Sequence, residues 1–198
     1  MSENKSKKQV VNELRIEYAV EQKKGMPFIM ASFVVWMLML IAFLTNFDIA
    51  IKNIIAMCCS ALLMPLGMLF GKLLKVNTIS NTNPLSGLAI FVSINQVLYL
   101  PIVLWAMYAI PDKMIMIYAI IVGAHFLAFY WLYFSPTYFY ASIIIPIASL
   151  ILGIYFNQVI VCLAFVLFDI LICLLLCLEN KQARKYLEEI NEQEQSGN

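Results

Sequence analysis

Charged residues are scarce in this chain and nearly absent from its middle. Only 13% of the 198 residues are charged, whereas 63% are hydrophobic, and a typical soluble domain is closer to half apolar. Between positions 27 and 177, long apolar segments follow one another with only short polar joins. The joins are too short to form a soluble domain, so the composition predicts a polytopic membrane protein with one membrane domain.

Residue patterns that support catalysis or bind a cofactor are also missing. His125 is the only histidine, which excludes a metal site built from several histidines. The five cysteines lie inside apolar segments without a C-x-x-C pair, so we expect neither a zinc site nor a thiol redox motif. No H-E-x-x-H sequence and no serine- or glycine-based nucleophile motif is present. We therefore expect no cofactor and no enzymatic activity, and an intramembrane enzyme is the least favoured class.

Six apolar segments have the length of membrane-spanning helices, because about 20 residues are needed to cross about 30 Å of hydrocarbon. We expect an all-α fold in which residues 27–178 form a bundle of six transmembrane helices. Polar tails flank the bundle at 1–26 and 179–198. The expected helices cover residues 27–45, 53–71, 85–108, 113–134, 137–156 and 158–178.

The N-terminal tail predicts a short amphipathic helix over residues 9–24. Val11, Leu14 and Tyr18 follow helical spacing and form one narrow apolar stripe. Gly25 and Pro27 then predict a helix end followed by a new start. Two interpretations are equally open: a helix that lies in the membrane interface, and a short helix packed on the end of the bundle.

The distribution of basic residues predicts the orientation. Lysine and arginine are enriched in cytoplasmic loops, and here they gather in both tails and in the join after the second segment. Lys52 and Lys113, each near an acid, are the basic residues of the opposite side. Both termini are therefore expected in the cytoplasm, with the bundle in the plasma membrane. No cleavable signal peptide is evident, so the first segment is expected to remain as an anchor. The net charge of +1 gives no indication of nucleic-acid binding.

Two prolines lie near the centres of the second and fifth segments and predict helix breaks. Pro65 and Pro146 stand in similar surroundings, with two small residues and three aliphatic residues before each proline. Proline removes one helix hydrogen bond. Paired breaks in two halves of opposite orientation indicate a transporter site, although a chance match over eight positions is the alternative.

Polar side chains, whose burial in hydrocarbon is energetically unfavourable, lie near the centres of three segments. They are Asn95 and Gln96 in the third, His125 in the fourth and Asp169 in the sixth, with Tyr99 one turn beyond Asn95. Polar groups at this depth usually face the bundle interior. The functional interpretation is a substrate or ion site in which Asp169 titrates and His125 is its partner. The alternative is that a neutral Asp169 bonds to Asn95 or Gln96 and joins the helices.

A G-x-x-x-G pattern, formed by Gly67 and Gly71, lies near one end of the second segment. Such a pattern lets two helix backbones approach closely. It predicts either a homodimer contact or packing within one subunit.

Several short motifs are distributed along the chain, at residues 13–19, 25–28, 83–85, 95–99, 123–125 and 131–133. Together they resemble a family of small bacterial six-helix membrane proteins, mostly from Gram-positive bacteria, whose domain has no known function. The resemblance covers nearly the whole chain and implies a bacterial plasma-membrane location. It implies no activity and no functional residues.

The favoured function is a small transporter or permease for an unknown solute or ion, with a polar site at the membrane midplane. The alternative is a non-catalytic membrane sensor, assembly factor or partner subunit, which is suggested by the small mass outside the bilayer and by the amphipathic N-terminal segment. Apart from the lipid bilayer and a possible second copy, the sequence predicts no partner.

Overall fold

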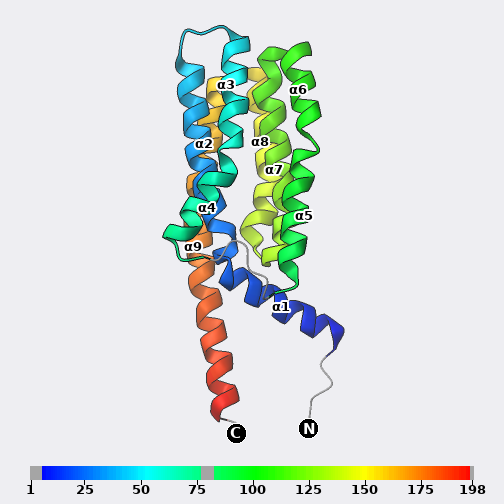
Figure 1. The fold of residues 1–198 in the computed structure, drawn as a ribbon, viewed down its shortest axis with the longest axis vertical. Coiled ribbons are helices and arrows are strands. Elements are labelled where there is room, and N and C mark those ends of the chain that lie inside the picture. Colours follow the sequence, from blue (N-terminus) through cyan, green and yellow to red (C-terminus); the bar gives the residue numbers. More distant parts are fainter. Residues whose placement is uncertain (1–5, 77–82, 197–198) are drawn as a thin grey trace.

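In the computed structural model, which describes residues 6–76 and 83–196, every regular element is helical (Figure 1). A short 3₁₀ turn, η1 (Lys23–Gly25), joins the first two helices, and another, η2 (Pro111–Lys113), precedes the seventh. The helices are α1 (Lys7–Glu21), α2 (Met26–Leu44), α3 (Ile49–Ala61), α4 (Leu63–Leu73), α5 (Leu85–Val97), α6 (Leu100–Ala109), α7 (Met114–Tyr133), α8 (Pro136–Tyr155) and α9 (Gln158–Ser196).

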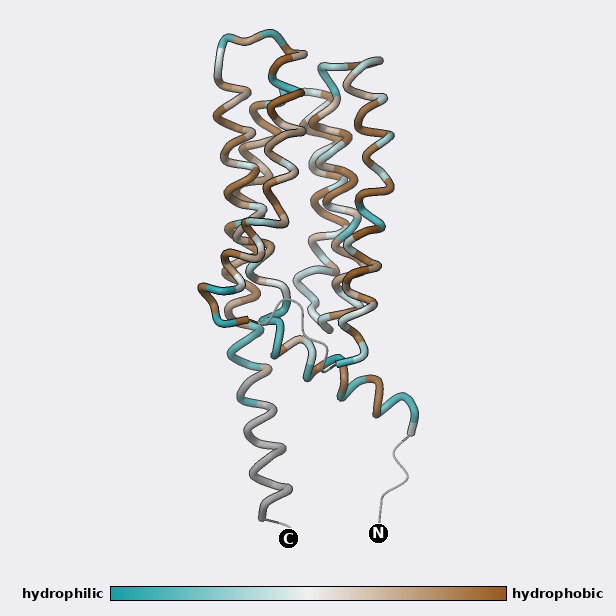
Figure 2. The backbone as a smooth tube through the Cα atoms, viewed as in Figure 1, coloured by the Kyte–Doolittle hydropathy of each residue, from teal (hydrophilic) through white to brown (hydrophobic). Residues whose placement is uncertain are grey.

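Six of the helical spans are long and apolar enough to cross a membrane, as the sequence predicted. The first five spans start and end within a few residues of the expected positions. The sixth helix, α9, continues well past its expected end at residue 178. Apolar residues follow the six spans, and polar residues gather at the bundle ends and on α1 (Figure 2). Because hydrocarbon has no hydrogen-bonding partner for the backbone, a helix is the form in which each span satisfies its own backbone groups.

The helix breaks differ from those expected at Pro65 and Pro146. The second span does divide, since α3 ends at Ala61 and α4 begins at Leu63, two residues before Pro65. In contrast, α8 continues through Pro146 without interruption, so the break expected there does not occur. The third span divides instead, between α5 and α6, with Pro101 as the second residue of α6. The breaks therefore fall in the second and third spans and do not form an inverted pair.

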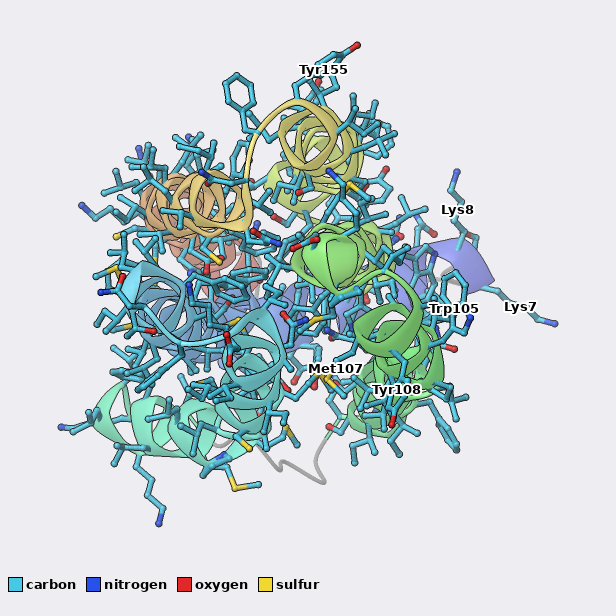
Figure 3. All side chains as sticks on the ribbon, turned by 90° about the horizontal axis from the view of Figure 1, so that it is seen from above. Lys7, Lys8, Trp105, Met107, Tyr108 and Tyr155 are labelled. Carbon is cyan, nitrogen blue, oxygen red and sulfur yellow. The ribbon has the colours of Figure 1, made fainter. Side chains whose placement is uncertain are left out.

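The core lies among α2, α7, α8 and α9, while the other two spans lie at the sides. Trp36 of α2 stacks on Phe165 of α9 with ring centroids 4.0 Å apart, and both residues are buried. No residue of α5 is buried. In the view along the bundle, Trp105 and Tyr108 of α6 point outward (Figure 3), and Tyr108 is 90% exposed. The α5–α6 span is thus attached to the core along one side only.

Both ends of the polypeptide lie at the same end of the bundle, which we call the terminal end (Figure 1). Here α1 packs across α5, α7 and α9. Arg15 donates a hydrogen bond to the Trp131 carbonyl (2.6 Å) and lies over the Trp131 ring. Tyr18 stacks on Tyr133, and burial raises the pKa of Tyr18 to about 12, which keeps its phenol neutral. In this structure, α1 packs on the end of the bundle.

The two glycines of the G-x-x-x-G pattern are buried inside the protomer. Gly67 faces Phe28 of α2, and a Cβ atom at this position would lie 2.4 Å from Phe28 ring carbons. Close packing of α4 on α2 therefore depends on the missing side chain at Gly67. The pattern accounts for a contact within one subunit.

We predict that Gly67→Ala lowers the unfolding midpoint in detergent. Phe28 would have to move to accept the methyl group, and overpacking of this kind costs about 1–3 kcal/mol. The matched control is Gly87→Ala in α5, where no atom lies within 4 Å of the added Cβ. The control should be neutral or slightly stabilising, because alanine is the better helix former. Equal midpoints for the two variants would contradict this account.

Candidate functional site

A pocket of about 430 Å³ lies between the third span and α7 and contains three polar side chains. Asn95 comes from α5, Tyr99 from the turn between α5 and α6, and His125 from α7. Five apolar residues complete the lining: Ile120, Ile121, Ala124, Leu127 and Ala128. The pocket therefore brings together three of the five residues that the sequence predicted for a substrate site.

The pocket lies near the middle of the membrane-spanning helices. His125 is the twelfth residue of α7, a helix of 20 residues, which places it about 16 Å along a helix of about 30 Å at a rise of 1.5 Å per residue. Asn95 is similarly central in the span from Leu85 to Ala109. Polar groups at this depth are far from bulk water.

The break between α5 and α6 shapes this pocket. Proline has no backbone N–H, so Pro101 cannot donate to the carbonyl of Val97, and α5 ends at that residue. Tyr99 lies in the resulting turn and lines the pocket together with Asn95 of the preceding helix. Pro101, which was not among the predicted helix breaks, is the sequence signal for this one.

His125 has an imidazole nitrogen that no group of the described structure satisfies. The side chain is only 9% exposed, and its Nε2 atom is buried without a hydrogen-bond partner. Phe129 covers part of the ring edge-on, with centroids 4.9 Å apart. Buried polar side-chain atoms are usually paired. This pocket-lining residue therefore has a hydrogen-bonding atom that no described group of the protein uses.

The pocket lining carries no formal charge unless His125 is protonated. Asn95 and Tyr99 are neutral, and the other lining residues are apolar. An amide, a phenol and a neutral imidazole can each donate or accept a hydrogen bond. The pocket can therefore bind a neutral group that needs both a donor and an acceptor.

Asp169 and Gln96 do not line this pocket. Asp169 is fully buried between α9 and α2, where Ser32 donates a hydrogen bond to Oδ2 (2.8 Å) and Oδ1 has no partner. His125 Nε2 and Asp169 Oδ1 are both unpaired, so they are not bonded to each other. Gln96 is half-buried on α5. The structure thus separates the acid from the residues that the sequence grouped with it.

Asp169 is held by a hydrogen bond and not by an ion pair. No lysine, arginine or histidine of the described residues pairs with it. Burying such a group without a cationic partner is costly. The Ser32 hydroxyl is therefore the contact through which Asp169 joins α9 to α2.

We predict that Ser32→Ala lowers the free energy of unfolding by about 1–3 kcal/mol, because it leaves a buried acid without its hydrogen-bond donor. Asp169→Asn should cost less, since an amide still offers Ser32 a partner of the same shape. Ser142→Ala is the control, because the Ser142 hydroxyl bonds only to the Phe139 carbonyl of its own helix. Denaturation in detergent measures all three variants, and a Ser32→Ala result that equals the control would exclude a stabilising role for the bond.

A second polar cluster lies at the terminal end and was missed in the sequence. The Glu179 carboxylate of α9 accepts hydrogen bonds from the ammonium group of Lys24 (2.8 Å), the Ser135 hydroxyl (2.6 Å), and both the hydroxyl and the backbone N–H of Thr137. Thr137 is the second residue of α8, so Glu179 satisfies the N-terminus of a neighbouring helix, where an anion is favoured. This cluster joins η1, α8 and α9.

The backbone at this cluster is strained. Lys23, Lys24 and Gly25 all have positive φ angles, and the two lysines are not residues that favour this region. Lys24 is nevertheless buried, and its carbonyl accepts a bond from the Tyr138 hydroxyl (2.8 Å). The sequence placed Lys24 among topology signals and Glu179 in a tail, and only the tertiary structure pairs them.

Glu179→Ala is expected to lower the free energy of unfolding by about 3–5 kcal/mol, because it leaves the buried Lys24 without a counter-charge. Glu179→Gln should lie between Glu179→Ala and the wild type, as it keeps acceptors for the two hydroxyl groups. The control is Glu17→Ala on the exposed face of α1. The role of the cluster would be refuted by a Glu179→Ala protein as stable as this control.

The fold and the pocket define a class: a helical, multi-pass membrane protein with a mainly apolar pocket that contains three polar side chains. Residues 11–179 match a family of unknown function, DUF7010, and the chain belongs to this family. The family assignment confirms the resemblance to a small membrane protein family without a known function. Comparison with curated proteins and with solved structures gives no match.

Proposed function

We propose that the protein is a small transporter of the permease type, which binds its solute in the pocket formed by Asn95, Tyr99 and His125. The single observation that supports this proposal is the buried, unpaired Nε2 of His125 in a pocket at mid-membrane depth. A polar group without a partner at that depth is costly. A ligand that pairs with it would offset this cost each time it binds.

The loose attachment of the third span supports movement at the pocket. No residue of α5 is buried, and the helix break at Tyr99 lies next to the pocket. Segments with few buried contacts open at a low free-energy cost. A hinge of this kind would let α5 move against α7 while α6, whose Val103 and Ala106 are buried, stays with the core of α2, α7, α8 and α9. The proposal involves no chemical step.

The proposed orientation has both termini in the cytoplasm and the bundle in the plasma membrane. Lys72 and Lys75 lie at the same end as the termini, whereas Lys52 and Lys113 lie at the other end. This asymmetry follows the usual excess of positive charge on the cytoplasmic side.

Transport predicts that water reaches the pocket. With the native cysteines replaced, Ala128→Cys should react with N-ethylmaleimide, an uncharged reagent that modifies hydrated thiols, when it is added on at least one side of the membrane. Ala119→Cys is the matched control on the same helix, because Ala119 is fully buried. Glu17→Cys on α1 reports sidedness with a charged, membrane-impermeant methanethiosulfonate reagent and should react only in inside-out vesicles. Mass spectrometry measures the extent of labelling.

An unreactive Ala128→Cys on both sides would contradict the transport proposal. A second candidate would then take its place: a non-catalytic partner subunit that uses the exposed α5 as a contact surface. Reaction of Glu17→Cys only in right-side-out vesicles would reverse the proposed orientation.

A further inference from the structure

The route into the pocket between α5 and α7 is open on the side of the bundle. Leu127 is 52% exposed and Tyr99 is 42% exposed, although both lie in the middle region of membrane-spanning helices. Residues exposed at this depth face hydrocarbon and not water. A molecule dissolved in the bilayer can therefore reach the pocket directly between the two helices.

The pocket chemistry restricts the ligand to an uncharged molecule. Asp169, the only acid in the middle of the six spans, lies at the α2–α9 contact and is bonded to Ser32. The pocket lining has no carboxylate, lysine or arginine that would pair with an ion. Binding an ion there would leave its charge without a counter-charge, which is strongly unfavourable in hydrocarbon.

The lining also requires that the ligand be amphipathic. Five of the eight lining residues are apolar, and the three polar ones offer hydrogen bonds from an amide, a phenol and an imidazole. A volume of about 430 Å³ lies at the low end of the range of about 300–1,000 Å³ that holds small organic ligands. These properties fit a small molecule with an apolar skeleton and one hydroxyl or carbonyl group.

A comparison with the groove between α8 and α9 supports this choice of site. That groove has a similar volume of about 390 Å³, and its polar lining residues are Thr137, Tyr140, Glu179 and Gln182. Thr137 donates a hydrogen bond to Glu179, which also pairs with Lys24. Among the lining residues of the two sites, only His125 has a buried side-chain atom, Nε2, that is without a partner in the described structure.

We propose that the ligand is an uncharged amphiphile that enters sideways from the bilayer between α5 and α7 and bonds through its hydroxyl or carbonyl group to His125 and Asn95. This inference rests on the proposed function, because it names the class of solute for the same pocket. It narrows the solute from any small molecule or ion to a neutral one that partitions into hydrocarbon.

The test uses a photoreactive probe of this class, 4-(hydroxymethyl)benzophenone, on the full-length protein in lipid vesicles. The probe is neutral, partitions into bilayers and carries both a hydroxyl and a carbonyl group. Benzophenone-4-sulfonate is the matched probe, with the same rings and a permanent negative charge. After illumination, mass spectrometry of peptides locates the adducts. We expect adducts of the neutral probe on the lining residues of α5 and α7, and none of the charged probe.

Two substitutions on adjacent residues test the hydrogen bond. Asn95→Leu should reduce labelling of the pocket by about fivefold or more, as expected for the loss of one hydrogen bond. Gln96→Leu makes the same change on the same helix, outside the pocket lining, and should leave labelling unchanged. Ala128→Leu, which fills the pocket, should act like Asn95→Leu.

Three results would overturn the inference: adducts spread evenly over the lipid-facing helices, equal labelling of wild type and Asn95→Leu, or labelling of the pocket by the sulfonate. The comparison of the two probes on wild-type protein does not depend on the folding of any variant. Reaction of Ala128→Cys with the thiol reagent, without photolabelling of the pocket, would leave the transport proposal intact and reject the neutral amphiphile. Photolabelling of the pocket without reaction of Ala128→Cys would reject the transport proposal and leave the neutral amphiphile as a ligand of the pocket.

Discussion

Hydrocarbon offers no hydrogen-bonding partner, and the structure of this protein follows from how its polar groups meet that constraint. The backbone is satisfied inside six helical spans. Charged and amide side chains gather at the two ends of the bundle. Lys24 and Glu179 pair at one end, and the amides of Asn53 and Gln158 donate to carbonyls of η2 at the other. Where a polar side chain lies deep in the bundle, as Asp169 does, a neighbouring helix supplies its partner. His125 Nε2 and Asp169 Oδ1 are both without a partner in the described residues, but only His125 lines the α5–α7 pocket.

The bundle divides into a tightly packed part and a loosely attached part. Gly123 allows α7 and α8 to approach so closely that a Cβ atom there would lie 2.7 Å from Ile145, and α2 and α9 meet through stacked rings. In the third span, α6 contributes the fully buried Val103 and Ala106 to the core, whereas no residue of α5 is buried. Glu179 extends the rigid part to the terminal end, since its carboxylate joins η1, α8 and α9. A pocket at the boundary between a rigid and a loose part can change shape without disturbing the core, which is a common arrangement for a binding site.

The two polar groups that the sequence made most prominent have different roles in the structure. Asp169 is an internal contact between α2 and α9, whereas His125 faces the α5–α7 pocket. The sequence interpretation combined them because both lie at the same depth. Depth is only one coordinate, however, and two residues at the same depth can face opposite sides of a bundle. The same reason explains why Gln96 and Asn95, adjacent in sequence, differ in their access to the pocket.

The sequence by itself determined the membrane class, the number of spans and their limits, because hydrophobic length and charge act locally along the chain. It also identified Asn95, Tyr99 and His125 as costly polar groups. Only the tertiary structure decided which helices meet, since the apolar faces of membrane helices are chemically alike and their pairing depends on shape. Pro146 in a continuous helix, Gly67 against Phe28, and Lys24 paired with Glu179 all depend on contacts between segments distant in the chain. The sequence carries the residues for these contacts but not the geometry that brings them together.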